Sequence, residues 1–268
     1  MIICKSTAEI EKLRRSGQVV TQLLEELRQR VRPGITTLEL EKYVELRLPQ
    51  LGARSAFKDY RGYPHCLCTS INEEVIHGMP SGRHLKDGDI IGLDMGVVVD
   101  NYYGDSAITI PAGRIAPAAQ RLLQVAEEAL ELAIERTRVG SRVGDLSAAI
   151  QEHAEKNGYS VVREFVGHGI GLSLHEEPQV PNYGRAGRGP VLKEGMVLAL
   201  ETMINEGTEA VQIKADKWTA ITADAKLSAH FEHMVAVTRN GPDVLTRPDS
   251  RKWAWRTRFE SAPAASGF

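Results

Sequence analysis

The chain has 268 residues, of which 33 are Lys or Arg and 35 are Asp or Glu, so its formal net charge at pH 7 is −2. This balance argues against a nucleic-acid-binding protein driven by overall charge, and no apolar run approaches the length of a membrane span. The length suits an enzyme-sized unit, and without a linker rich in Pro, Gly and Ser we predict a single domain. Residues 1–16 lack the apolar core of a signal peptide, so we expect a cytoplasmic protein in which Cys4, Cys66 and Cys68 are free thiols.

The first half of the chain predicts two helices followed by strands. Ser6 with Glu9, and Thr36 with Glu39, have the spacing of capping boxes that open helices. The predicted elements are helices from residue 6 to about 31 and over 37–51, then strands at 66–70, 74–77, 90–99 and 103–110. Asp100-Asn101 is typical of a hairpin turn between the last two strands.

The second half predicts the same order of elements. Pro117 opens a helix that reaches about Thr137, and Ser141 can cap a helix over residues 143–157. The remaining predicted strands lie at residues 161–166, 195–204, 209–214 and 230–238. Antiparallel strands with helices over one face make an α+β layered fold.

Two stretches of the chain are versions of one another. Residues 85–94 align without gaps on residues 192–201, and each stretch is a polar Gly turn, an apolar strand and a final carboxylate. Residues Gly34, Leu40, Val44 and Gly52 recur 106 positions later as Gly140, Leu146, Ile150 and Gly158. We therefore predict two related halves, about 1–110 and 111–238, whose pseudo-twofold axis brings Asp94 and Glu201 together.

The acidic residues at strand ends point to a metal centre. The predicted hairpin places Asp105 opposite Asp94, His168 lies between two glycines, and Glu201 and Glu232 occupy late, otherwise apolar strands. A charge at the edge of the core needs a partner or a metal. Oxygen ligands with one imidazole suit Mn, Fe, Co or Zn, and four carboxylates are enough to bridge two ions. His77 and His175 then remain for hydrogen bonds to substrate.

With these residues, the chain resembles the type I methionine aminopeptidases of peptidase family M24, in their bacterial short form, which have the pita-bread fold with internal pseudo-twofold symmetry. The resemblance covers about residues 10–238. Its motifs are Tyr60-x-x-Tyr63-Pro64, Ser70-Ile71-Asn72-Glu73 through His77-Gly78, Asp94, Gly104-Asp105, the Gly-rich run 167–171 around His168, His175-Glu176-Glu177-Pro178, Glu201 and Phe231-Glu232-His233.

The resemblance implies a metal-dependent hydrolase that removes the initiator methionine of nascent proteins when the second residue is small. Asp105 and Glu232 would bridge two divalent ions, Asp94 would bind one ion, and His168 and Glu201 the other. Glu201 would be the general base, His175 would donate to the scissile carbonyl, and His77 would contact substrate near the cleaved bond. The implied methionine pocket is formed by Tyr60, Tyr63, Cys68 and Trp218, with His77 and His175 also touching substrate.

Further expectations follow from the same resemblance. Asn72 and Ser228 lie where relatives form a site for a monovalent cation, Na or K. The protein would act as a monomer with a transient ribosome contact. The balanced charge and the lack of a long apolar run, in turn, predict no nucleic-acid specificity and no membrane association. Leu174 replaces an aromatic residue common at the pocket wall, which loosens the pocket. The catalytic domain would span residues 1–246, and residues 247–268 would form a tail outside the resemblance.

Two alternatives remain at this level. The first is an Xaa-Pro peptidase of the same fold, although those relatives generally carry a further N-terminal domain. The second is a non-catalytic pita-bread module that binds proteins or ribosomes. Such modules lose metal ligands, whereas this chain keeps all five.

Overall fold

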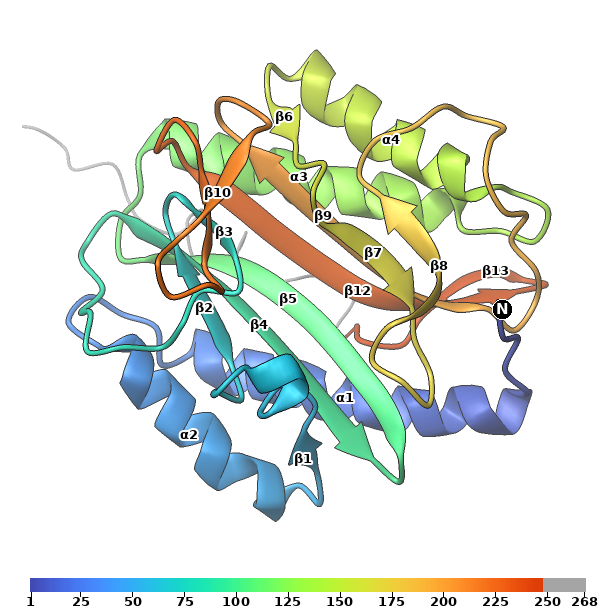
Figure 1. The fold of residues 1–268 in the computed structure, drawn as a ribbon, viewed down its shortest axis with the longest axis horizontal. Coiled ribbons are helices and arrows are strands. Elements are labelled where there is room, and N and C mark those ends of the chain that lie inside the picture. Colours follow the sequence, from blue (N-terminus) through green and yellow to red (C-terminus); the bar gives the residue numbers. More distant parts are fainter. Residues whose placement is uncertain (248–268) are drawn as a thin grey trace, which may run out of the picture.

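The computed structural model describes residues 1–247. The predicted tail therefore lies, apart from Arg247, outside the described residues. Figure 1 shows helices packed on one side of a strongly twisted antiparallel sheet. The α-helices of the described range are α1 (Thr7–Arg28), α2 (Thr37–Gln50), α3 (Pro117–Arg136) and α4 (Val143–Lys156), and a short 3-10 helix covers Tyr60–Gly62.

The predicted starts of the first two helices are confirmed. Ser6 Oγ accepts from the backbone N–H of Glu9, whose carboxylate accepts from the backbone N–H of Ser6 at 2.8 Å. Thr36 and Glu39 form the same reciprocal pair at the start of α2. Each box satisfies two N–H groups that the helix itself leaves without acceptors.

The expected cap of α4 is wrong by one residue. The N-cap is Arg142, whose backbone N–H donates to Asp145 Oδ2 at 2.7 Å, and not Ser141. The carbonyl of Ser141 accepts a hydrogen bond from Leu192 N instead, and Arg142 forms a β-bridge with Val191. Because Ser141 is held in extended chain by its pairing with Leu192, the cap position falls on the next residue, Arg142.

Ten strands form one antiparallel sheet within residues 1–247, and three short strands form a second sheet. The strands are β1 (Arg54–Ser55), β2 (Cys68–Ile71), β3 (Glu74–Ile76), β4 (Asp89–Val99), β5 (Tyr102–Ala112), β6 (Ser160–Val161), β7 (Val166–Gly169), β8 (Glu176–Pro181), β9 (Val197–Asn205), β10 (Val211–Ile213), β11 (Ala220–Thr222), β12 (Ser228–Thr238) and β13 (Gly241–Val244). The main sheet has the order β1-β4-β5-β12-β9-β7-β8. In addition β13 pairs with β12, β2 with β4 and β6 with β9, and the small sheet has the order β10-β11-β3.

The strand predicted over residues 161–166 is wrong. Val161 pairs with Ile204 and His168 pairs with Ala199, so seven steps along one chain oppose five along β9. The surplus residues cannot stay in the ladder, and they bulge toward the concave side of the sheet, where Glu164 and Phe165 line a cavity. The chain therefore makes two short strands, β6 and β7, where one was expected.

The predicted strands at 66–70 and 209–214 are displaced or shortened, and four strands were not predicted. β1, β11 and β13 have two to four residues, too few for a periodic pattern. β8 carries Pro178 and Pro181, which weaken a strand signal, but β8 lies at the edge of the sheet, where proline is tolerated.

The predicted hairpin between β4 and β5 is confirmed. Asp100 and Asn101 both have positive φ, at 49° and 68°, which is the backbone of a two-residue turn that matches the strand twist. Val99 then pairs with Tyr102, and the ladder continues without a slip to Asp89 and Ala112. This register fixes which residues of the two strands share a face.

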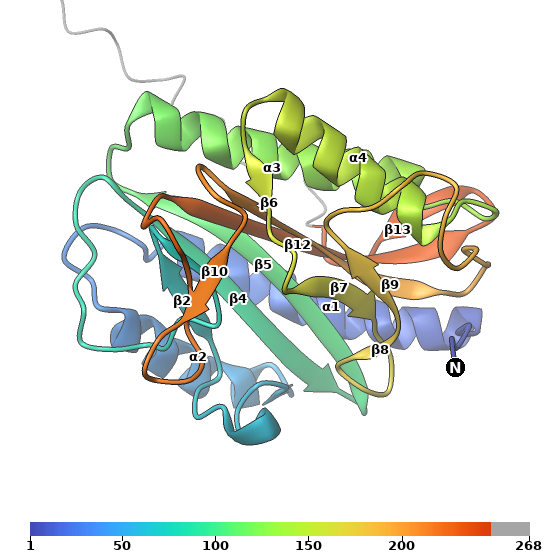
Figure 2. The same ribbon diagram turned by 45° about the horizontal axis from the view of Figure 1, so that its top comes forward.

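Equivalent turns appear in the two halves. Gly34 and Gly140 have φ of 90° and 92°, and their N–H groups donate to Leu85 O at 2.7 Å and Leu192 O at 3.0 Å. Figures 1 and 2 show α1 and α2 beside β4 and β5, and α3 and α4 beside β9 and β12. The repeat in the sequence thus corresponds to a repeat in the arrangement of elements.

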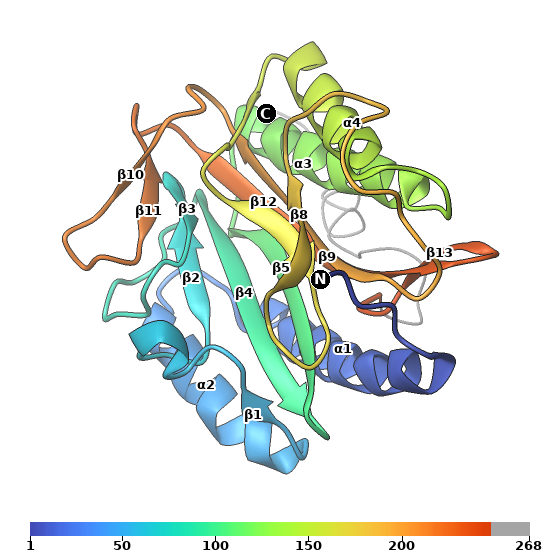
Figure 3. The ribbon, with the colours of Figure 1, turned by 45° about the vertical axis from the view of Figure 1, so that its right-hand side comes forward.

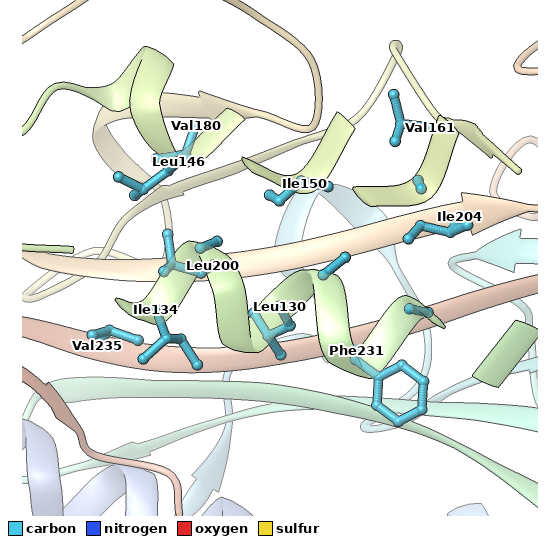
Figure 4. Packing of buried hydrophobic residues seen from close by; sticks show 14 of the residues in the cluster. Leu130, Ile134, Leu146, Ile150, Val161, Val180, Leu200, Ile204, Phe231 and Val235 are labelled. Atoms are coloured by element: carbon cyan, nitrogen blue, oxygen red, sulfur yellow. The ribbon is translucent and has the colours of Figure 1, made fainter. Parts of the chain in front are cut away.

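The helix-facing side of β9 and β12 is apolar. In Figure 4, Leu200 and Ile204 of β9 and Phe231 and Val235 of β12 pack with Leu130 of α3 and its neighbours. Because side chains alternate along a strand, the next residue after Leu200 and the next after Phe231 point to the opposite, concave face. Burial against the helices therefore fixes where Glu201 and Glu232 project.

Candidate metal centre and substrate cavity

One row of the main sheet collects the acidic residues. Reading across the paired strands, this row contains Cys68, Asp94, Ala107, Glu232 and Glu201. Residues directly opposite one another share a face, so the three carboxylates project together. Asp105, two residues before Ala107, and His168, opposite Ala199, lie on the same face. Asp94 and Glu201, predicted to meet at the centre, flank the central strands β5 and β12.

The distances bring these groups within reach of shared ions. His168 Nε2 lies 3.9 Å from Asp105 Oδ2 and 3.8 Å from Glu201 Oε1. Ligand atoms of Asp105, His168 and Glu232 all lie within 4.8 Å of one another. These contacts are too long for hydrogen bonds but suit donor atoms arranged around a cation.

Three carboxylate oxygens in this cluster are buried without a hydrogen-bond donor among residues 1–247: Asp94 Oδ1, Asp105 Oδ1 and Glu232 Oε1. A buried charged oxygen without a partner is costly. Within the described residues, no Lys or Arg forms an ion pair with these three acids or with Glu201. The donor set, with carboxylates and an imidazole, therefore fits divalent metal ions, which would supply the missing positive charge.

His168 is held in the tautomer that a metal ligand requires. Its Nδ1–H donates to the carbonyl of Gly169 at 3.0 Å, because a carbonyl can only accept. The lone pair is then on Nε2, which faces the carboxylates. Burial lowers the pKa of His168 to about 3, so the ring is neutral at pH 7.

Burial and mutual repulsion raise the pKa values of the four acids. Burial raises the pKa of Asp94 to about 7. Burial, and then the charges of Asp94 and Glu201, raise the pKa of Asp105, and the pKa values of Glu201 and Glu232 rise for the same reasons. Without cations, the cluster therefore holds protons that isolated carboxyl groups would release.

The metal-free protein is expected to lose stability as the pH rises from 6.5 to 8. A carboxyl group with a raised folded pKa stabilises the fold fully below its unfolded pKa of about 4, and this stabilisation is lost as the pH rises through the folded pKa. Burial lowers the pKa values of five histidines, and this opposing effect fades as the pH rises through their unfolded pKa of about 6.5: His77, His168, His175, His230 and His233. Toward pH 8 the acids dominate, at about 1.4 kcal/mol per pH unit for each proton released on unfolding.

Urea unfolding of chelator-treated protein at both pH values measures this loss. The metal-saturated protein is the control, and its stability should change less because the cations hold the carboxylates ionised at both pH values. A metal-free stability that stays level or rises from pH 6.5 to 8 would contradict the repulsion in the cluster.

A cavity of about 350 Å³ opens on the concave face beside the acids. Every residue predicted for the site lines it: Tyr60, Tyr63, Cys68, His77, Asp94, Asp105, His168, His175, Glu201, Trp218 and Glu232. The aromatic end is ordered by contacts within it. The rings of Tyr63 and Trp218 meet edge to face with centroids 5.1 Å apart, and Tyr63 Oη donates to Leu67 O and Gly78 O.

His175 joins the aromatic end to the acids. Its Nδ1 lies 2.8 Å from Tyr60 Oη, and its ring lies 4.3 Å from that of His168 between centroids. Burial, and then the charge of Arg61, lower the pKa of His175, which favours the neutral ring. The next residue, Glu176, forms a buried ion pair with Lys5 at 2.6 Å. Figure 3 shows the N-terminal segment that carries Lys5 beside β8 and β9.

Eight further residues line the cavity. Leu174, expected to loosen the pocket wall, is one of them and is 2% exposed. Six others were not predicted from the sequence: Phe57, Arg61, Ile76, Glu164, Phe165 and Val166. The eighth, His230, was also missed, although a signal was present. It stands two positions before Glu232 in an expected strand, and period-two alternation places both on one face.

Comparison with known proteins identifies the family. The model of metallopeptidase family M24 matches residues 11–239. Methionine aminopeptidase 1 of Bacillus subtilis is 47% identical over 247 residues, which cover 92% of this chain and 100% of that protein. The crystal structure of methionine aminopeptidase from Thermotoga maritima aligns with a TM-score of 0.91 at 44% identity, over 92% of this chain and 100% of the other. The chain belongs to metallopeptidase family M24.

Within that family the chain belongs to the methionine aminopeptidases, which are metallo-exopeptidases that use metal ions to hydrolyse peptides. The predicted family, the α+β pita-bread fold and the enzyme class are thereby confirmed. The prolidase of Pyrococcus furiosus, at 24% identity and a TM-score of 0.74, shares the fold alone, and this chain covers 66% of it. No helix within residues 1–247 is long and apolar enough to cross a membrane.

Proposed function

We propose that the protein removes methionine from the N-terminus of nascent proteins whose second residue is small. The observation that carries this proposal is a single cavity that joins an aromatic and thiol-lined end to the acid and histidine cluster. A peptide bond at the junction would have its methionine on one side and the hydrolytic groups on the other. The catalytic domain is proposed to span residues 1–246.

The methionine side chain would occupy the end lined by Tyr63, Cys68 and Trp218, with Tyr60 at its edge. Aromatic faces and a buried thiol suit a flexible, polarizable thioether. Tyr63 and Cys68 are 4% and 3% exposed, so the pocket excludes water around an apolar group. Leu174 adds an aliphatic wall where an aromatic ring was expected.

Two divalent ions, Mn, Fe, Co or Zn, would be held by Asp94, Asp105, His168, Glu201 and Glu232, with Asp105 and Glu232 shared between them. When bound, such ions lower the pKa of water and stabilise negative charge on oxygen. The orphaned oxygens of Asp94, Asp105 and Glu232 support this assignment.

The protein's own groups would move the protons. Glu201 would take a proton from the attacking water and return it to the leaving amine. His175 would accept a hydrogen bond at Nδ1 from Tyr60 Oη and so carry its proton on Nε2. Its Nε2–H would donate a hydrogen bond to the scissile carbonyl oxygen as that oxygen gains charge. His77, which is mostly buried with its ring edge-on to Phe165 at 5.6 Å, would contact the substrate beside the cleaved bond.

Finer features belong to the same proposal. Asn72 and Ser228 would help to hold a monovalent cation, Na or K, and a hydrogen bond from Ser228 N to Asn72 O at 2.9 Å keeps them adjacent. A cytoplasmic location is supported by the free thiols of Cys4, Cys66 and Cys68. We also propose a monomer with a transient ribosome contact.

The test compares Met-Ala-Ser with Met-Leu-Ser as substrates, after chelation and with Mn, Co, Fe or Zn restored. Metal-dependent release of methionine from the alanine peptide alone is expected, because a cavity of about 350 Å³ that holds methionine leaves little room for a branched second side chain. Ala-Pro-Ser is the control substrate, and its cleavage in preference to Met-Ala-Ser would favour an Xaa-Pro peptidase. Absence of cleavage under every metal would favour a binding module.

A further inference from the structure

His230 is a buried imidazole at the acid cluster to which the proposed reaction assigns no part. It lies on β12, opposite Met203 of β9, and is 4% exposed. Its backbone is fixed by Thr109, whose hydroxyl accepts from His230 N at 2.9 Å and donates to His230 O at 2.7 Å. The ring therefore projects from a rigid part of the sheet into the cavity that Glu201 also lines.

The ring nitrogen Nε2 has no hydrogen-bond partner within residues 1–247 and is shielded from solvent. The acidic oxygen that faces it is Glu201 Oε2, at 3.6 Å. The other oxygen of the same carboxylate, Oε1, faces His168 Nε2 at 3.8 Å. Glu201 thus stands between two imidazoles, one presented to each oxygen.

The two imidazoles differ in which ring nitrogen is free to carry a proton. His168 uses its proton on Nδ1 for a carbonyl and presents a lone pair. A neutral imidazole carries one N–H, on either Nδ1 or Nε2. A lone pair on Nε2 would repel the carboxylate, whereas an N–H would be attracted to it. Closing the gap to a normal hydrogen bond needs a shift of about 0.5 Å.

We propose that His230 is a positioning residue for Glu201: it donates Nε2–H to Oε2 and so fixes the plane of the carboxylate. Oε1 is then presented on the side of His168, where the proposed base must work. This inference rests on the proposed role of Glu201 as general base. The competing possibility is that Nε2 is a sixth metal ligand, since 3.6 Å is close to the 3.8 and 3.9 Å that separate His168 Nε2 from its acidic neighbours.

The test uses two variants of similar volume, His230→Gln and His230→Leu. The Gln amide can donate in place of Nε2–H, and Leu cannot. With Met-Ala-Ser and saturating Mn²⁺, His230→Leu is expected to lower kcat about 10- to 100-fold with KM nearly unchanged, which is typical for the loss of an orienting hydrogen bond. His230→Gln should recover kcat to within about threefold of wild type. Titration calorimetry should give His230→Gln a Kd for Mn²⁺ close to wild type, whereas His230→Leu, which leaves the Glu201 carboxylate unoriented, should also weaken Mn²⁺ binding.

His233→Leu is the matched control. This buried histidine of the same strand lies on the opposite face, where its Nδ1 meets Thr246 Oγ1 at 2.8 Å. Its loss should lower thermal stability but leave kcat of the folded enzyme unchanged. A wild-type kcat in His230→Leu would overturn the proposal, as would failure of Gln to rescue. A Kd for Mn²⁺ raised 10- to 100-fold in both variants would assign Nε2 to the metal instead.

A readout that does not need activity separates this inference from the proposed function. Long-range ¹H–¹⁵N spectra of histidine-labelled protein, loaded with diamagnetic Zn²⁺, report the tautomer of each ring. The signals lost in His230→Gln identify His230, and they should be those of an Nε2–H ring. An Nδ1–H ring would overturn the proposal. A wild-type protein with the Nε2–H signal but no methionine release would contradict only the proposed function.

Discussion

Changing Asp105 or Glu232 to Ala is expected to lower kcat/KM for methionine release about 10³-fold or more, the equivalent of the several kcal/mol that metal ions supply to such reactions. Both carboxylates are buried, at 4% and 3% exposure, and each has an oxygen without a donor within residues 1–247. They lie on β5 and β12, the central strands of the sheet, between Asp94 and Glu201. Loss of either should separate the metal ligands into two incomplete sets.

Metal content after dialysis, measured by mass spectrometry, should fall in the same variants. The metal-free variants should also be more stable than metal-free wild type at pH 8, because one of four mutually repelling acids is gone. Glu11→Ala is the control, since Glu11 lies on α1 with 57% of its side chain exposed, and it should change neither property. Wild-type activity at saturating metal in Asp105→Ala or Glu232→Ala would refute the two-ion scheme.

Glu201→Gln is expected to lower kcat about 10²- to 10⁴-fold, the range for loss of a general base. Gln keeps the volume and one oxygen donor of Glu, so KM and the affinity for metal should change far less. A fall in kcat and kcat/KM by the same factor would mean that the lost interaction acts in the transition state. The measurement is steady-state cleavage of Met-Ala-Ser under saturating metal.

Glu194→Gln is the comparison for this second variant. Glu194 forms an exposed ion pair with Arg239 at 2.6 Å, and such pairs contribute little. This variant should behave as wild type. If Glu201→Gln retains kcat, the base must be another group and the positioning role of His230 loses its basis. If it fails because metal is lost, calorimetry with Mn²⁺ will show that directly.

The sequence predicted local structure well where short-range rules decide it. Capping boxes at Ser6 and Thr36 need only residues three apart, and the Asp100-Asn101 turn needs two residues that tolerate positive φ. The repeat was also readable, because equivalent turns such as Gly34 and Gly140 need the same backbone. The boundaries of the halves and of a domain at residues 1–246 stay predictions.

Local rules failed where a distant strand imposed the geometry. The bulge after Val161 follows from the way β6 and β7 align on β9. The sequences of these two short strands do not reveal that alignment. Ser141 does not cap α4 because a segment fifty residues later pairs with it. His230 was missed because its importance depends on Glu201, which faces it from the neighbouring strand, β9.

The sequence by itself determined the helices, the main hairpin and the residue types that suit a metal-dependent hydrolase, because these depend on periodicity, capping and ligand chemistry. Only the tertiary structure decided that β5 lies beside β12. This seam joins residues far apart in the chain: Ser106 Oγ donates to Glu232 O at 2.6 Å, and Thr109 Oγ1 to His230 O. This pairing forms because both halves of the sheet pack against their own helices. It places the buried acids close enough to share cations, and it places the imidazole of His230 where an N–H can meet the carboxylate of Glu201.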